Sequence, residues 1–258
     1  MEFKTAGDLS NPVILFFHAM GVVGDSSQPI ANELASKYYC ILPTSSVYCL
    51  NQEYYSKENE VEQIQAFLKD KGIQEIELIV ASSLGADLAM AFIVKNTFLV
   101  KHVFFDGGQF AQIGKTTRKI MVPFLYGALK SLFLSKGKTL KKLMWCDDDS
   151  IKPYFIEAGK NLKYKNLKKQ MSDSLENKPF PKLSKELQEH TFFEFGNQED
   201  HFKYREAVMK AYPYGHYPIF DGYNHMQYQI CDPKGFANML ECVIENNHLP
   251  TLPFVKKD

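Results

Sequence analysis

Hydrophobic and polar residues follow two alternating patterns along most of this 258-residue chain. Short apolar runs, such as residues 12–17 (PVILFF) and 100–105 (VKHVFF), predict strands that are buried on both faces of a sheet. Longer segments place apolar residues at the offsets of one helix face, as residues 58–71 do. The alternation of the two patterns predicts an α/β fold built on a mostly parallel, doubly wound sheet.

The predicted elements cover both ends of the chain. Strands are expected at residues 1–5, 12–17, 38–42, 75–81, 100–105, 190–195 and 217–220. Helices are expected at residues 28–37, 58–71, 200–211 and 234–246, and directly after Ser83. Pro43 is expected to close the third of these strands.

The alternation stops between residues 109 and 189. This stretch has no obvious buried strand, but residues 117–135 and 151–175 have helical patches. We interpret residues 109–189 as a helical cap or lid, inserted after what we count as the sixth core strand. Residues 1–108 and 190–258 would then form the core.

Composition excludes several classes of protein. A hydrophobic content of 45% with 23% charged residues is typical of a globular protein, and 30 basic residues balance 30 acidic ones. That balance predicts no nucleic-acid partner. The five cysteines are odd in number and never form CxxC, which points to a reducing compartment. With no apolar signal core and no membrane-length run, we expect a cytoplasmic protein without membrane insertion.

The candidate nucleophile is Ser83, at the corner between a predicted strand and a predicted helix. Ala81 and Gly85 flank it in the small-x-Ser-x-small pattern of a nucleophile elbow. Small residues are needed because so sharp a turn leaves no room for larger side chains. Ser82 does not fit, because a frame centred on it would place Leu84 where a small residue is required.

Other reactive side chains also follow predicted strands. His18, Glu199 or Asp200, and His225 each come after one, and ligands of open parallel sheets bind beyond the carboxyl ends of strands. Serine, acid and histidine thus occur in the chain order Ser, Glu or Asp, His. A serine hydroxyl needs an adjacent base to become a nucleophile, and the base needs an acid to orient it.

Four motifs carry a resemblance to a known family. They are HAMG at 18–21, ASSLG at 81–85, FGNQED at 195–200 and GYNHMQ at 222–227. With these motifs in this order, nearly the whole chain resembles the α/β-hydrolase superfamily, in particular its serine esterase and lipase members with a helical cap.

The resemblance implies a role for individual residues. Ser83 would be the nucleophile and His225 the general base. The family's spacing, counted from Gly196, selects Glu199 as the acid, with Asp200 and then Asp106 as alternatives.

The resemblance also implies an oxyanion hole. The backbone amides of Leu84 and of Met20 or Ala19 would form it, and the family usually has glycine at the position of Ala19. His18 would hold this loop by hydrogen bonds.

The expected activity is hydrolysis of a small or medium carboxylic ester, a small-molecule substrate, without metal or organic cofactor. The alternatives are a non-catalytic ligand-binding protein of the same fold and a hydrolase of thioester, lactone, amide or C–C bonds. The cap would decide among substrates, and the sequence leaves the oligomeric state open.

Overall fold

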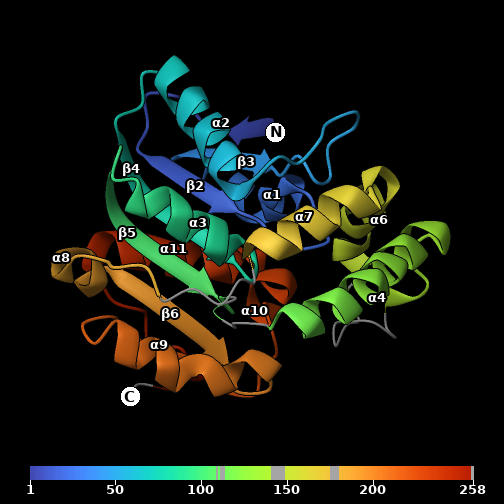
Figure 1. The fold of residues 1–258 in the computed structure, drawn as a ribbon. Coiled ribbons are helices and arrows are strands. Elements are labelled where there is room, and N and C mark those ends of the chain that lie inside the picture. The colour runs from blue at the N-terminus through green and yellow to red at the C-terminus, as the bar shows by residue number, and fades with distance from the viewer. Residues whose placement is uncertain (109, 111–113, 141–148, 175–179, 257–258) are drawn as a thin grey trace.

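An eight-stranded sheet forms the centre of the protein (Figure 1), whose computed structural model describes residues 1–108, 110, 114–140, 149–174 and 180–256. Its strands are β1 (Glu2–Ala6), β2 (Val13–Phe17), β3 (Tyr39–Thr44), β4 (Glu75–Ser82), β5 (Leu99–Asp106), β6 (Thr191–Gly196), β7 (Ile219–Phe220) and β8 (Val255–Lys256). Their order across the sheet is β1-β3-β2-β4-β5-β6-β7-β8. The two edge strands are antiparallel to their neighbours, and the other pairs are parallel.

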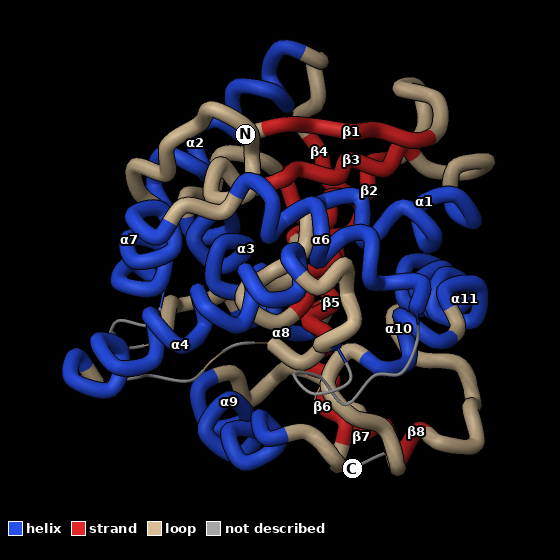
Figure 2. The backbone as a smooth tube through the Cα atoms, turned by 90° about the vertical axis from the view of Figure 1, so that its right-hand side faces the viewer, coloured by secondary structure: helices blue, strands red, loops and turns tan. Residues whose placement is uncertain are grey.

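Helices cover both faces of the sheet. They are α1 (Gln28–Leu34), α2 (Lys57–Asp70), α3 (Gly85–Val94), α4 (Lys115–Leu134), α6 (Lys152–Asn161), α7 (Tyr164–Ser174), α8 (Lys185–Glu189), α9 (Arg205–Ala211), α10 (Gln227–Cys231) and α11 (Pro233–Asn246), with 3-10 turns η1 (Gly24–Ser27), η2 (Asp149–Ile151) and η3 (Asp200–Tyr204). Helices α2, α3 and α9 pack on one face and α1 and α11 on the other, as Figure 2 shows from the side. None of the described helices is both long and apolar enough to cross a bilayer.

This arrangement confirms the predicted α/β fold with a mostly parallel sheet. Strands β2, β4 and the end of β5 are buried because helices cover both of their faces, which explains their continuous apolar runs. The last helix begins where its sequence predicts: Pro233 occupies its first turn, and the Asp232 side chain accepts a hydrogen bond from the Gly235 amide at 2.8 Å.

The third strand runs further than expected, because Pro43 lies inside β3 and does not end it. Phe3 of β1 pairs with Pro43, whereas the pairing of β3 with β2 ends at Leu15 and Ile41. Proline is tolerated there because its missing N–H removes no bond to β2. The short elements α8, α10 and β8 were not predicted, since two to five residues give too little periodicity.

The segment between β5 and β6 contains helices α4, α6, α7 and α8 and, in its described part, no strand. The strand before it, which we count as the sixth from the sequence, is the fifth of the chain. A third apolar cluster joins α4, α6 and α7 to the loops after β2, β3 and β4. Our interpretation of residues 109–189 as a separate cap stays a prediction.

Candidate functional site

Ser83 lies on the tight turn between β4 and α3. Its φ is 51°, a left-handed backbone conformation that residues other than glycine seldom adopt, and its amide donates to Asp106 O at 3.0 Å. Gly85 begins α3 directly against β2: a β-carbon at this position would lie 2.3 Å from Phe17 O. The turn therefore requires a small residue where the sequence motif has one.

His225 and Glu199 meet beyond the ends of β6 and β7. The Nδ1 atom of His225 lies 2.5 Å from Glu199 Oε2. Neither Asp200 nor Asp106, the alternative acids, makes a hydrogen bond to His225 in the described structure. Asp200 opens η3 and borders the cavity described below.

Asp106 and Ser82 belong to a separate, fully buried polar cluster. Gln229 Nε2 donates to Asp106 Oδ2 at 2.6 Å and to Ser82 Oγ at 3.0 Å. Burial raises the pKa of Asp106 to about 6. Burial also raises the pKa of Glu194, and the neighbouring charge of Asp106 raises it further. These two carboxyls therefore favour sharing one proton, and Asp106 is engaged away from the His225 ring.

A cavity of about 580 Å³ joins the elbow to the helical segment. Ser83 and His225 both line it, and no hydrogen bond joins these two side chains among the described residues. The remaining wall is largely apolar and comes from α4, α6, α7 and the loops after the strands, with residues such as Met121, Leu125, Leu129, Leu132, Phe155, Met171 and Met226. The volume lies in the range of small-molecule sites.

Three backbone amides near Ser83 have no acceptor among the residues that the structure describes. Those of Leu84, Ala19 and Met20 donate no hydrogen bond to any described residue, and all three residues line the cavity. The next amide, of Gly21, is held by the Tyr48 hydroxyl at 2.8 Å. The turn after β2 and the start of α3 thus present free donors beside the serine, which is the arrangement an oxyanion hole requires.

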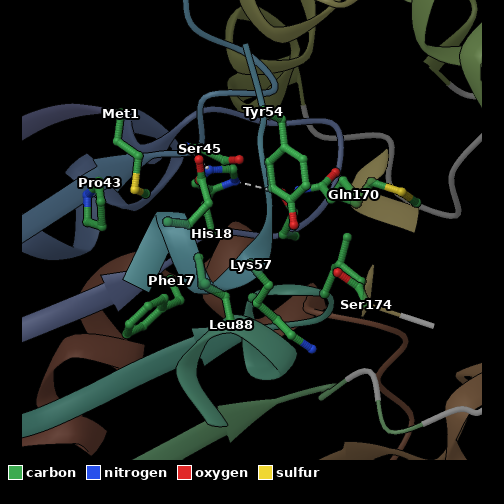
Figure 3. Close-up of a pocket in the computed structure, with 15 residues that line it drawn as sticks. Met1, Phe17, His18, Pro43, Ser45, Tyr54, Lys57, Leu88, Gln170 and Ser174 are labelled. Atoms are coloured by element: carbon green, nitrogen blue, oxygen red, sulfur yellow. Dashed lines mark hydrogen bonds between the residues drawn. The ribbon is translucent and has the colours of Figure 1, made fainter. Parts of the chain in front are cut away.

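His18 holds the turn after β2 and is not among the residues that line the cavity of about 580 Å³. It lines instead a second, smaller cavity, which Figure 3 shows. Its Nε2 accepts a hydrogen bond from the Ser45 amide at 3.1 Å, so the ring proton lies on Nδ1, which donates to Ala19 O at 2.7 Å. Burial lowers the pKa of His18 to about 4, which keeps the ring neutral. The small cavity beside it, about 30 Å³, has room for roughly one or two water molecules and no organic ligand.

Burial also shifts the pKa values of His225 and Glu199. Desolvation lowers the pKa of His225, and the charges of Asp106 and Asp200 act in the opposite direction. Desolvation raises the pKa of Glu199 to about 7, opposed by His201. A neutral imidazole with its proton on Nδ1 can accept a second proton at Nε2, which is the capability of a general base.

Two residues beside this pair were missed from the sequence. Gly107 has a φ of 55°, and a β-carbon there would lie 2.5 Å from His225 Nδ1 and 2.9 Å from Glu199 Oε2. The His201 ring packs edge-on to His225 with 4.8 Å between ring centroids. The Gly107-Gly108 pair after a strand was a visible signal, whereas nothing in the sequence distinguished His201 from the other histidines.

Comparisons with known proteins bear on the fold. No protein-family model matches the sequence, and no curated protein does. Among solved structures, a protein described as an alpha/beta hydrolase family member from Desulfitobacterium hafniense has a TM-score of 0.73 at 13% identity, covering 95% of this chain and 100% of its own. An esterase from Exiguobacterium antarcticum has a TM-score of 0.71 at 10% identity, covering 95% of both chains.

A third solved structure, from work on carboxylesterases of Nitrososphaera gargenis, has a TM-score of 0.68 at 12% identity and covers 96% of both chains. Identities this low establish a shared architecture and leave the activity open. The agreement extends over almost the full length of each chain. This protein therefore has the α/β-hydrolase fold that its sequence motifs predict.

Proposed function

We propose that this protein is a serine hydrolase, and specifically a carboxylesterase that cleaves small or medium acyl esters through an acyl-enzyme intermediate. One observation carries the proposal: Ser83 and His225 border the same cavity, and Glu199 Oε2 lies 2.5 Å from the Nδ1 atom of His225. The solved structures of similar fold that are described as esterases add support for ester chemistry.

In this mechanism His225 Nε2 takes the proton of Ser83 as its Oγ attacks the ester carbonyl. Glu199 holds the proton on Nδ1 and stabilises the imidazolium that forms. His225 then gives the proton to the leaving alcohol, and a water molecule activated by the same nitrogen releases the acid. The missing hydrogen bond between Ser83 and His225 would form with substrate, since such bonds are often long in unliganded enzymes.

The oxyanion would lie between the turn after β2 and the start of α3. The unpaired amides of Leu84 and of Met20 or Ala19 are its donors, and losing one donor of this kind typically costs about 2.7–4 kcal/mol of barrier stabilisation. His18 positions this turn by fixing the carbonyl of Ala19.

The apolar wall of the cavity would receive the acyl chain. Helices α4, α6 and α7 supply most of it, so we assign to residues 109–189 the role of a cap that selects the acyl group. A volume of about 580 Å³ is sufficient for a medium-length chain and its alcohol.

The test is a panel of p-nitrophenyl esters of increasing acyl length, measured on the wild type and on Ser83→Ala. We expect turnover by the wild type with a maximum at short or medium chains, and a fall to background in the variant. A fluorophosphonate probe should label the wild type at Ser83. If the wild type shows neither turnover nor labelling, the result would favour the alternative of a ligand-binding protein.

A matched pair of acid variants tests the rest of the assignment. Glu199→Gln should lower kcat by roughly 10³–10⁴-fold, because the imidazole loses the partner that fixes its tautomer. Asp200→Asn changes the next residue, which also borders the cavity, and should alter kcat by less than about threefold. Equal losses in the two variants would contradict Glu199 as the acid.

A further inference from the structure

A second use of the candidate site follows from a third side chain, His201. Ligand atoms of Glu199, His201 and His225 all lie within 4.8 Å of one another, and among the described residues no other three histidine, cysteine or carboxylate side chains converge in this way. Glu199 immediately precedes η3, His201 lies in its first turn, and His225 comes from the loop before α10. Two separate loops thus bring two imidazoles and one carboxylate together.

The cluster contains polar atoms that the protein leaves unsatisfied. The Glu199 side chain is 0% exposed, and its Oε2 faces His225. Within the part of the chain that the structure describes, its Oε1 has no hydrogen-bond partner of good geometry, although the nearby Gly196 backbone lowers the pKa of this carboxyl group. The Nδ1 atom of His201 is also buried and has no hydrogen-bond partner among the described residues. A buried polar atom without a partner costs about 1–3 kcal/mol, so the cluster favours a ligand that would engage both atoms.

We propose that Glu199, His201 and His225 form a binding site for a zinc ion. Two imidazoles and a carboxylate with an open fourth position are a ligand set that zinc accepts, whereas Mg²⁺ and Ca²⁺ prefer oxygen ligands. Ligand atoms in a tetrahedral zinc site are roughly 3.4 Å apart, given metal–ligand distances of about 2.0–2.2 Å. To reach that spacing, the Nδ1–Oε2 distance of 2.5 Å would widen and the longest separation, at most 4.8 Å, would shorten, each by side-chain movements of about 1–1.5 Å. The cavity, which His201 and His225 both line, provides the entry path.

Zinc at this site inhibits hydrolysis, a consequence that rests on the proposed function, although metal binding itself does not. The His225 atom nearest the carboxylate is Nδ1, so the metal takes the lone pair of that nitrogen. The proton that Nδ1 carried moves to Nε2, and the imidazole stays neutral. With Nε2 protonated, His225 has no lone pair left to accept the Ser83 proton, so the serine stays unactivated until the metal leaves.

The experiment is a titration of the metal-free protein with Co²⁺, whose visible absorption reports four-coordinate binding, followed by competition with Zn²⁺. We expect one saturable site per chain in the wild type and in Ser83→Ala, because Ser83 is not a ligand. His201→Gln should weaken binding by about tenfold or more, the scale on which even outer groups of metal sites act. The matched control is His190→Gln, which removes one member of another close histidine pair, His102 and His190, whose ring centroids are 5.2 Å apart. The affinity of this variant for Co²⁺ should equal that of the wild type.

The inhibition is measured separately, as ester turnover or fluorophosphonate labelling with and without Zn²⁺, each variant relative to its own metal-free rate. Zinc should suppress the turnover and labelling of the wild type and of His190→Gln, and its effect on His201→Gln should be at least about tenfold smaller. Absence of a cobalt spectrum, or equal binding by His201→Gln, would overturn the site and favour an ordered water between Glu199 and His201. A cobalt spectrum without turnover or labelling would retain the metal site and refute the hydrolase.

Discussion

At the scale of single residues, the geometry of the candidate site depends on a glycine that performs no chemistry. Gly107 follows β5 with a φ of 55°, and the His225 ring and the Glu199 carboxylate fill the space that a side chain would need. The residue thus combines a left-handed backbone with close approach, two conditions that glycine alone satisfies without strain. The close contact between His225 and Glu199 therefore requires that residue 107 have no side chain.

We expect Gly107→Ala to separate His225 from Glu199. The new methyl group would lie 2.5 Å from Nδ1, and a displacement of about 1 Å at such a site typically lowers kcat by roughly 10²-fold. The measurement is kcat with the best p-nitrophenyl ester. Gly72→Ala is the control, because Gly72 also has positive φ, 71°, but no atom within 4 Å of the added carbon. A Gly107→Ala enzyme as active as Gly72→Ala would contradict this positioning role.

The sequence predicted which types of residue would meet more readily than it ranked them. Places after strands indicated His225 and either Glu199 or Asp200, and the family spacing counted from Gly196 selected Glu199. The structure brings Glu199 to His225 while Asp106 turns toward Gln229. Without the family spacing, the choice among Glu199, Asp200 and Asp106 depends on side-chain direction at the ends of the strands, which position after a strand does not encode. The same is true of His201, whose proximity to His225 is produced by two loops that are separate in sequence.

At the scale of elements, several polar contacts tie the helical segment to the core, and one group of them lies at the end of α7. The side-chain carboxylate of Asp173, near the end of α7, accepts hydrogen bonds from the Tyr54 hydroxyl at 3.1 Å and the Lys57 amide at 3.3 Å. Lys57 Nζ donates to the Asp173 carbonyl at 3.3 Å and forms an ion pair with Asp87 of α3 at 2.8 Å. Helices α2, α3 and α7 thus share one polar junction, which limits how freely α7 can move.

Asp173→Ala should loosen α7 without unfolding the core. Losing two hydrogen bonds to the carboxylate costs roughly 1–2 kcal/mol, so amide hydrogen exchange in α7 should accelerate by roughly 5–30-fold while β4 stays protected. The control, Asp149→Ala, removes an exposed ion pair with Lys152 in the same helical segment and should leave exchange in α7 unchanged. Equal exchange in wild type and Asp173→Ala would show that the other contacts of α7, among them the Asn166 side chain with Gln52 O at 3.2 Å, are sufficient to hold this helix.

Element patterns explain what could be predicted at this scale. Helix α4 and the strands β2 and β4 carry long periodic or continuous apolar signals, and each was found within a few residues. The helical patch that the sequence predicts at residues 151–175 contains, over its described residues, the end of η2 and the two helices α6 and α7, divided after Asn161. Apolar periodicity continues across that break, so only the backbone direction reveals it.

At the scale of the whole molecule, the strand order brings four loops that are distant in sequence to the carboxyl ends of the strands. Strands β2, β4, β5 and β6 lie side by side in parallel, so the residues that follow them share the same end of the sheet. His18 fixes one of these loops to the residues after β3 through its two ring nitrogens. The stability of this loop therefore depends in part on the protonation of the His18 ring.

This dependence predicts how stability changes with pH. The pKa of His18 is lowered from 6.5 to about 4 in the folded protein. Between pH 6.5 and about pH 4, therefore, this side chain is protonated in the unfolded chain and neutral in the folded protein. The contribution of neutral His18 is therefore complete above about pH 6.5 and lost as pH falls toward 4, by up to about 3 kcal/mol. Urea unfolding of wild type and His18→Gln should show a stability difference that favours the wild type at pH 7.5 and shrinks by about 2 kcal/mol at pH 4.5.

His248→Gln is the control for that comparison, because His248 Nδ1 also lies 2.7 Å from the carbonyl of the following residue, Leu249, near the other end of the chain. A shrinkage of the same size in both variants would mean that the effect does not come from the loop after β2. A difference for His18→Gln that stays constant with pH would mean that water reaches the ring and stabilises its charged form. The predicted result instead identifies His18 as the group through which acid releases the turn that carries Ala19 and Met20, and with it the proposed oxyanion hole.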